Sequence, residues 1–272
     1  MRLKPAAAAL ARRSGLVSGL QRVEHQIRLN RIRPDFIAGP PHFVGIGAQK
    51  AGTTWWHALV AAHPNVTLPI TRSKELHYFD NLWGSVLDDG AIRDYHRLFS
   101  RPSGLISGEW TPRYMYDFWS LSCLKLAAPE VRLLILLRDP VDRFQSGLTH
   151  ELYRHGRPSP TTVSECFNRG LYASQIERAF GVFPPHQVLV LQMEQCIADP
   201  GYWLKATYRF LGLPASHVPP DLHTPVGRSR ISKVSLSTEV VDHLVRLYRS
   251  DVARLPDLVP NLDLTYWPRF SV

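Results

Sequence analysis

Short apolar runs alternate with segments of helical spacing along most of the chain. The run at residues 131–137 is the strongest of these runs, and its composition is typical of a parallel strand buried on both faces. Further strands are predicted at residues 43–47, 104–109 and 187–192, and helices at residues 55–62, 141–153, 201–211 and 240–248. This order of strands and helices predicts an α/β fold with a central parallel sheet flanked by helices.

The first 40 residues form a separate region. Apolar residues recur at spacings of four, three and four from Leu16 to Ile27, which predicts one apolar face of a helix. Pro34 and the Gly-Pro-Pro run at residues 39–41 mark a boundary. We therefore expect a basic helical arm at residues 1–40 and one domain at residues 41–272. The arm suits packing on the domain; contact with a second copy of the chain and peripheral contact with an anionic membrane are the alternatives.

Composition supports this division. The 272 residues are 44% hydrophobic, which suffices for one α/β domain with a sizeable core. The net charge is +9, but residues 1–33 hold eight Lys and Arg residues against the single acid Glu24. The domain itself is therefore close to neutral, and the sequence gives no indication that it binds nucleic acid.

The compartment follows from what the chain contains. No apolar stretch approaches the roughly 18 residues of a membrane span, and the run before Arg12 is too short for a signal peptide. Cys123, Cys166 and Cys196 are widely spaced and lack C-x-x-C or metal-ligand partners. We expect reduced thiols, no metal site and a cytoplasmic protein.

The loop after the first predicted strand carries the first candidate chemistry. A strand, a glycine loop and a helix in this order typically bind phosphate, because backbone N–H groups and the helix N-terminus face the anion. Gly47 and Gly52 have the spacing of a Walker A motif, but Thr53 stands where that motif has lysine. The lysine is Lys50, before the second glycine. This position favours a 5′-phosphate over the phosphate chain of ATP with magnesium.

A second candidate phosphate site follows the strand at residues 131–137. Asp139 suits the cap of a helix whose first residue is Pro140. Arg138 ends the strand and Ser146 lies about two turns into the helix, so a guanidinium and a hydroxyl are available for a dianionic phosphate. A purely structural pairing of Arg138 with Asp139 or Asp142 remains an alternative.

Both loops resemble motifs of sulfotransferases that use 3′-phosphoadenosine-5′-phosphosulfate (PAPS). The stretch from Lys50 to Trp55 is similar to the 5′-phosphosulfate loop, and the stretch from Arg138 to Ser146 is similar to the 3′-phosphate motif. The resemblance extends from Phe43 to about Trp267 and is closest to the heparan-sulfate type of carbohydrate sulfotransferase. It implies a P-loop-like three-layer fold, PAPS as co-substrate and 3′,5′-ADP as product. The residues it assigns to PAPS are Lys50, Ala51, Gly52, Thr53, Thr54, Trp55, Arg138, Ser146, Gly227 and Arg228.

The same resemblance assigns catalytic roles. Glu75, in the segment Lys-Glu-Leu-His-Tyr-Phe-Asp at residues 74–80, matches the glutamate base of the glycan-modifying members. It would remove the acceptor hydroxyl's proton during in-line attack on sulfur. Lys50 would stabilise charge on the leaving phosphate oxygen. His77 is the reserve base and is expected to contact substrate, together with Glu109, Trp110 and Thr111.

Two positions depart from the glycan enzymes. Trp110 and Val226 each replace a lysine, and an aromatic ring at residue 110 suits a sugar face, a lipid or a phenolic ring. We therefore expect a hydroxyl acceptor on a carbohydrate or glycolipid. The alternatives are a phenolic or other small-molecule hydroxyl, a nucleotide kinase, and a non-enzymatic binding module. Loops at residues 81–100 and 150–170 are expected to determine acceptor specificity.

Overall fold

A computed structural model describes residues 33–84, 86–224 and 232–271. The helical face predicted within the arm, and the predicted donor residues Gly227 and Arg228, lie outside the described residues. No helix among the described residues is both long and apolar enough to cross a membrane.

The domain is built on a five-stranded sheet, and every strand pair in it is parallel. The order is β2 (Val66–Thr67), β3 (Ile106–Trp110), β1 (Phe43–Gly47), β4 (Arg132–Leu137) and β5 (Val188–Gln192). The first strand in the sequence is thus the central one. Because parallel strands end at the same edge, the loops that follow β1, β3 and β4 meet at one side of the sheet.

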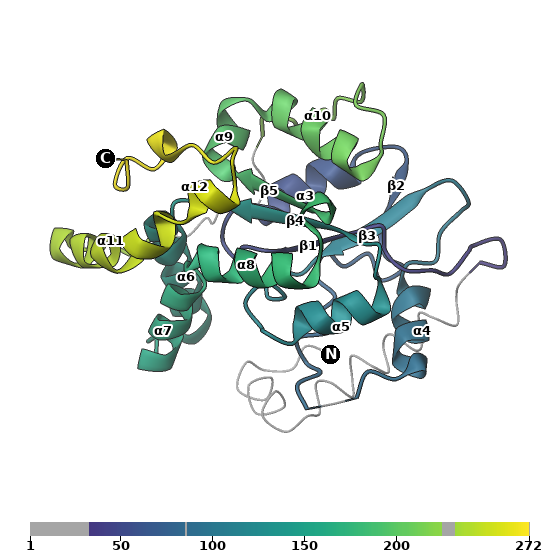
Figure 1. Cartoon of the computed structure of the whole chain (residues 1–272), viewed down its shortest axis with the longest axis horizontal. Coiled ribbons are helices and arrows are strands. Elements are labelled where there is room, and N and C mark those ends of the chain that lie inside the picture. The colour runs from purple at the N-terminus through teal and green to yellow at the C-terminus, as the bar shows by residue number, and fades with distance from the viewer. Residues whose placement is uncertain (1–32, 85, 225–231, 272) are drawn as a thin grey trace.

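Helices cover both faces of the sheet (Figure 1). One face packs against α3 (Thr53–Ala61), α9 (Met193–Ala198) and α10 (Pro200–Leu211). The other packs against α5 (Ser120–Ala127) and α8 (Tyr172–Val182), and α11 (Thr238–Val252) packs in turn against α8 and α6. The remaining helical elements of the described ranges are α4 (Asp89–Leu98), α6 (Pro140–His155), α7 (Pro160–Asn168), α12 (Leu255–Leu258), η1 (Pro185–Gln187) and η2 (Leu264–Tyr266).

The apolar run predicted as the strongest strand explains this three-layer arrangement. Along β4, Leu133 and Ile135 join the core on the α8 side, whereas Leu134 and Leu136 join the core on the α3 side. Side chains of a strand alternate between faces, so a nearly continuous apolar sequence places a core on each side of the sheet. The predicted P-loop-like α/β fold is confirmed.

The prediction that residues 81–100 and 150–170 are loops is wrong in part, because both segments contain helices. In residues 81–100, Asp88 caps α4 by accepting a hydrogen bond from Ala91 N at 2.7 Å, and Tyr95 and Leu98 bury its apolar side. Residues 150–170 hold the end of α6 and the whole of α7, which Ser159 caps. Asp88 and Ser159 are typical helix-capping residues, but the apolar residues that follow each of them are too few to predict a helix from the sequence.

Candidate active site

The glycine loop leaves an open helix N-terminus at the edge of the sheet. Gly52 is the N-cap of α3 with a φ of 88°, and it has no side chain to bond the first turn. A left-handed conformation of this kind suits glycine. A Cβ there would also lie 2.5 Å from the Met193 sulfur. The first N–H groups of a helix lack internal partners, so this N-terminus can receive an anion.

Lys50 enters the site through a left-handed backbone, with a φ of 69°. Burial lowers the pKa of Lys50, while the nearby carboxylates of Glu151 and Glu75 act in the opposite direction. Ala51 and the Trp55 indole are buried, and Trp55 N donates to Gly52 O at 3.0 Å. The Trp55 indole therefore anchors the loop in the core, and the contact of Trp55 with the donor stays a prediction.

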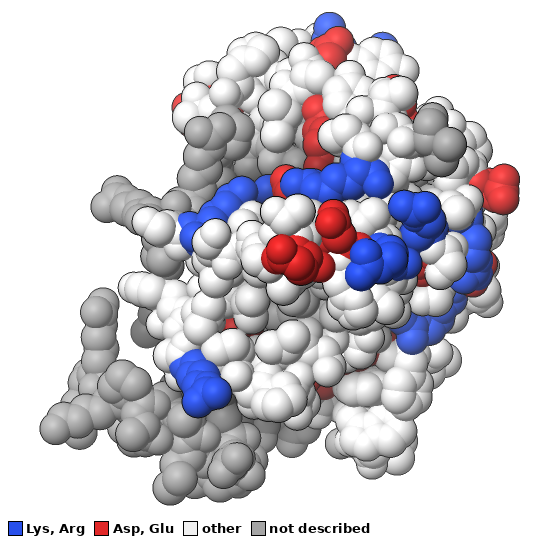
Figure 2. All heavy atoms as spheres, turned by 90° about the vertical axis from the view of Figure 1, so that its left-hand side faces the viewer, with Lys and Arg blue, Asp and Glu red and all other residues white. Residues whose placement is uncertain are grey.

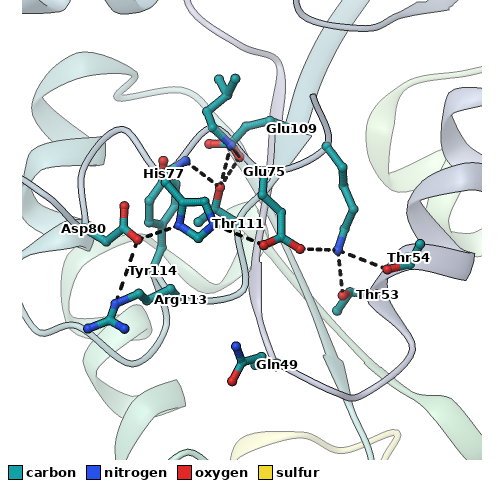
Figure 3. A network of polar contacts seen from close by, with 12 residues as sticks. Gln49, Thr53, Thr54, Glu75, His77, Asp80, Glu109, Thr111, Arg113 and Tyr114 are labelled. Atoms are coloured by element: carbon teal, nitrogen blue, oxygen red, sulfur yellow. Dashed lines mark hydrogen bonds and ion pairs between the residues drawn. The ribbon is translucent and has the colours of Figure 1, made fainter. Parts of the chain in front are cut away.

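A line of charged groups starts at α3 and includes the predicted base (Figure 3). The Lys74 ammonium donates to the hydroxyls of Thr53 and Thr54 at 3.1 and 3.4 Å and to Glu75 Oε1 at 2.8 Å. On its other side, Glu75 Oε2 lies 3.2 Å from His77 Nε2. A single cation thus joins the candidate phosphate loop to the candidate base.

The line continues beyond His77. His77 Nδ1 lies 2.6 Å from Asp80 Oδ2, and that oxygen lies 3.8 Å from Arg113 Nε. The hydrogen bond to Asp80, followed by that to Glu75, raises the pKa of His77 to about 10. His77 is therefore held between two carboxylates in its protonated form. The His77 ring lies beside Glu75, and the His77 backbone has a left-handed φ of 51°.

These neighbours also set the state of Glu75. Burial alone would raise the pKa of Glu75, but hydrogen bonds from His77 and Lys74 outweigh it and lower the pKa to about 2. The carboxylate is consequently ionised at any physiological pH and can accept a proton. Its basicity is weak for as long as both cations remain bound to it.

Residues at the end of β3 hold the segment that carries Glu75 in place. Trp110 N donates to Lys74 O at 2.7 Å, and Leu76 N donates to Thr111 Oγ1 at 3.0 Å and to Glu109 Oε2 at 3.3 Å. The Thr111 hydroxyl donates to the same Glu109 oxygen at 2.5 Å. Glu109, Trp110 and Thr111 are fully buried, and their predicted contact with substrate stays a prediction. They position the backbone on either side of Glu75.

Trp110 is buried for a reason visible in the sheet register. It pairs with Gly45 of β1, and a Cβ at Gly45 would lie 1.9 Å from the Trp110 ring. The indole occupies the space that a side chain would otherwise fill, and its Nε1 donates to Gly47 O at 3.1 Å. The ring that replaces a lysine therefore supports the phosphate loop from inside the core.

The second predicted phosphate site lies at the turn from β4 into α6. Asp139 caps α6, as predicted, by accepting from Val141 N and Asp142 N at 2.8 and 3.1 Å. Arg138 is partly exposed, contacts Lys50 O at 3.5 Å and lies 3.6 Å from Asp142. Ser146 is half-buried in the second turn of α6. The turn thus places Arg138 against the glycine loop.

The C-terminal segment fixes the same turn. Arg269 donates to Asp139 Oδ2 at 3.0 Å and to Asp142 Oδ1 at 3.1 Å. Glu194 accepts from Trp267 Nε1 at 2.9 Å and from Asp139 N at 3.0 Å. A segment 130 residues away in the sequence therefore orients the turn that carries Arg138.

Sequence reasoning missed two contributors. The sequence reasoning gave Lys74 no role, because adjacent side chains point to opposite faces in a strand. Residues 74 and 75 are not in a strand, so the two side chains can meet. The other is Arg169, which donates to the Gln49 amide oxygen of the glycine loop and pairs with Glu165 at 2.8 Å. No signal in the sequence linked Arg169 to that loop.

Burial of Glu109 has a measurable consequence. Burial raises the pKa of Glu109 to about 7, although hydrogen bonds from Thr111 and Leu76 favour the ionised form. The folded protein therefore binds this proton more tightly than the unfolded chain, and stability falls as pH rises from about 4.5 to 7. We expect Glu109→Gln, which stays neutral, to gain about 2–3 kcal/mol relative to wild type between pH 5 and pH 8. Urea unfolding at both pH values measures this difference.

The control is Glu130→Gln, since Glu130 is exposed. Its stability relative to wild type should not change with pH by more than a few tenths of a kcal/mol. An equally flat result for Glu109→Gln would mean that Glu109 is ionised in the folded protein at pH 5.

Charges of both signs lie on the face that carries α6, α7 and α11 (Figure 2). Lys and Arg side chains form a band across its middle, with Asp and Glu beside it. Exposed charges on these helices include Arg154, Arg246, Arg249, Glu239 and Asp242. The mixture agrees with the nearly neutral composition of the domain.

A central parallel strand that leads through a glycine loop into an open helix N-terminus defines the P-loop-like class of α/β proteins. Within this class, the profile of the sulfotransferase domain matches residues 40–234. The chain belongs to the sulfotransferase domain family.

Curated relatives include enzymes of heparan sulfate modification. Human heparan sulfate glucosamine 3-O-sulfotransferase 3B1 is 30% identical over 190 residues, which cover 64% of this chain and 46% of that protein. Human bifunctional heparan sulfate N-deacetylase/N-sulfotransferase 3 is 27% identical over 205 residues, with coverages of 64% and 22%. The chain therefore spans less than half the length of these relatives.

Solved structures agree with the family assignment. A sulfotransferase from Alicyclobacillus acidocaldarius has a TM-score of 0.68 and 25% identity, over 84% of this chain and 99% of that chain. Sulfotransferase STF9 from Mycobacterium avium shares the fold, with a TM-score of 0.55 at 12% identity over 94% of this chain and 83% of that chain.

Proposed function

We propose that this chain transfers the sulfuryl group of PAPS to a hydroxyl of a carbohydrate or glycolipid acceptor, with Glu75 as base. The observation that carries the proposal is the position of Lys74, which bonds Glu75 on one side and the hydroxyls of Thr53 and Thr54 at the α3 N-terminus on the other. The Lys74 side chain thus contacts both the candidate base and the start of α3, so the base and the candidate phosphate loop lie close together. Such closeness is what an in-line transfer between donor and acceptor requires.

PAPS supplies a sulfuryl group on a good phosphate leaving group. The acceptor oxygen forms a bond to sulfur, the bond from sulfur to the 5′-phosphate oxygen breaks, and the acceptor proton passes to the Glu75 carboxylate. The released nucleotide is 3′,5′-ADP. Lys50 and the N–H groups of α3 stabilise the charge that develops on the departing phosphate oxygen. Arg138 and Ser146 hold the 3′-phosphate.

The row of charged groups from Lys74 through Glu75 and His77 to Asp80, here called the charge line, changes the basicity of Glu75 during the reaction. Lys74 and His77 keep the basicity of Glu75 low for as long as both are bonded to it. When Lys74 turns toward the transferring anionic group, Glu75 loses one of its two cations, and its affinity for a proton rises. Asp80 keeps His77 protonated and in place throughout.

The acceptor class rests on the relatives. The names of the curated relatives specify heparan sulfate as their substrate. Position 110 carries a tryptophan, so this chain lacks the lysine that glycan enzymes have there. Because the Trp110 ring is buried, it also offers no exposed aromatic surface to the acceptor. A neutral hydroxyl acceptor therefore fits this site better than a polyanionic chain.

The test uses the intact chain with [35S]PAPS and a panel of neutral glycosides. Incorporation of label into a glycoside, with release of 3′,5′-ADP, is the expected result. Calorimetry should show 3′,5′-ADP binding more tightly than ATP with Mg²⁺, because Thr53 replaces the Walker A lysine. Tighter binding of ATP with Mg²⁺ would instead identify a kinase and reject the proposal.

A further inference from the structure

Two exposed aromatic side chains and a half-buried one form a cluster next to the line of charged groups. Trp83, Phe118 and Trp119, here called the aromatic patch, have ring centroids 5.1 Å apart in each of their three pairs. Trp83 is 65% exposed and Phe118 is 56% exposed, and Val86 beside them in the chain is 87% exposed. Exposed apolar clusters of this kind usually mark a binding surface.

The aromatic patch is connected directly to the candidate active site. Trp119 Nε1 donates to Phe79 O at 3.0 Å, which holds its ring against the segment that carries His77 and Asp80. Trp83 follows Asp80 by three residues. Phe118 follows Asp117, whose carboxylate binds Arg113 at 2.8 Å, and Arg113 reaches Asp80. The patch thus adjoins the end of the charge line that lies away from the phosphate loop.

We infer that the aromatic patch binds the alkyl chain of an amphiphilic acceptor whose hydroxyl lies at Glu75, an inference that rests on the proposed sulfotransferase function. The donor loop and the patch adjoin opposite ends of the line from Lys74 to Asp80. An acceptor that reaches Glu75 from the side away from the donor therefore passes the patch. Burying alkyl carbons against these rings supplies binding energy that is independent of the donor.

The chemistry of the patch favours an alkyl chain over a stacked sugar. A stacked sugar needs polar side chains beside the ring to bond its hydroxyls. Here Leu82, directly before Trp83, and Val86, three residues after it, are aliphatic, and the Asn81 amide nitrogen already donates to His77 O at 2.9 Å. The rings also meet one another at steep angles of 48° to 90°, which leaves an uneven apolar surface and no single flat platform.

The test compares two acceptors that differ only in the alkyl group: octyl β-D-glucopyranoside, kept below its critical micelle concentration, and methyl β-D-glucopyranoside. Calorimetry with the full chain saturated with 3′,5′-ADP should show the octyl glucoside binding at least tenfold more tightly. In the double variant Trp83→Ala/Phe118→Ala this advantage should fall below threefold. The control Tyr202→Ala removes an equally exposed ring on α10 and should keep the tenfold advantage.

Three results would overturn the inference. They are equal binding of the two glucosides to the wild type, an octyl advantage that survives in the double variant, and equal losses for both glucosides, which would indicate a sugar platform. Binding of 3′,5′-ADP, measured in a separate titration before the glucosides are added, separates these results from failure of the proposed function. A chain that does not bind 3′,5′-ADP rejects that function, whereas a chain that binds it without preferring the octyl glucoside rejects only the patch.

Discussion

Glu75→Gln is expected to lower kcat for sulfuryl transfer by about 10²–10⁴-fold, the range for loss of a general base. The amide keeps the size of the side chain but cannot take the acceptor proton. It also removes the ion pairs with Lys74 and His77, at 2.8 and 3.2 Å. Binding of 3′,5′-ADP should remain within a few-fold of wild type, because Glu75 is assigned to the acceptor side. Transfer of label from [35S]PAPS, together with calorimetry, measures both quantities.

Glu130→Gln is the matched control, because Glu130 is an exposed glutamate that should tolerate the same change without loss of activity. A Glu75→Gln variant with undiminished turnover would remove Glu75 from the mechanism. Turnover that falls only in proportion to 3′,5′-ADP affinity would place Glu75 in donor binding instead. In either case, His77 would become the next residue to test, since its ring contacts Glu75 directly.

Lys50→Met is expected to lower kcat by about 10²–10³-fold, comparable with the loss of one pre-organised group that stabilises developing charge. The affinity for 3′,5′-ADP should fall much less. The reason is that charge on the 5′-phosphate oxygen increases as the bond to sulfur breaks, so the ammonium interacts more strongly with the transition state than with the bound nucleotide. Burial already lowers the pKa of Lys50, so its charge is less shielded by solvent than that of a surface lysine.

Lys205→Met provides the comparison, since Lys205 is exposed on α10; it should leave both kcat and nucleotide affinity unchanged. Lys50→Arg retains the charge and should recover part of the rate. If Lys50→Met and wild type had the same kcat, the developing charge would have to be stabilised elsewhere, and Lys74 is the nearest cation bonded to the α3 N-terminus.

The secondary structure was largely predictable because its signals are local. The runs predicted as strands match β1, β3, β4 and β5, and the helices predicted after them match α3, α6, α10 and α11. The cap at Asp139 was also confirmed. The short strand β2 and the helices α4, α5, α7, α8, α9 and α12 were not predicted. For α4 and α7 the reason is that their apolar stripes are short. Short stripes become distinct only when a core is present to bury them.

The candidate binding residues of the site could be proposed from the sequence, but the residues that hold them in position could not. The residues around the loop could be identified by type and spacing, since phosphate binding needs glycines, a lysine and an open helix end. Glu109, Trp110 and Thr111 were assigned to substrate because polar and aromatic groups at a strand end usually face a ligand. The structure buries all three, and the place of the Trp110 ring depends on Gly45, which lies 65 residues before it.

The sequence by itself determined the parallel α/β architecture, and it identified the candidate phosphate loop at Lys50 and the candidate base Glu75, because each depends on residue types within a few positions of one another. The tertiary structure decided the arrangement of partners from distant segments. It placed Lys74 between the base and α3, it set the Trp110 ring in the space above Gly45, and it packed Trp83 against Phe118 and Trp119. These contacts join residues about 20 to 65 positions apart, and no local pattern encodes which of them meet.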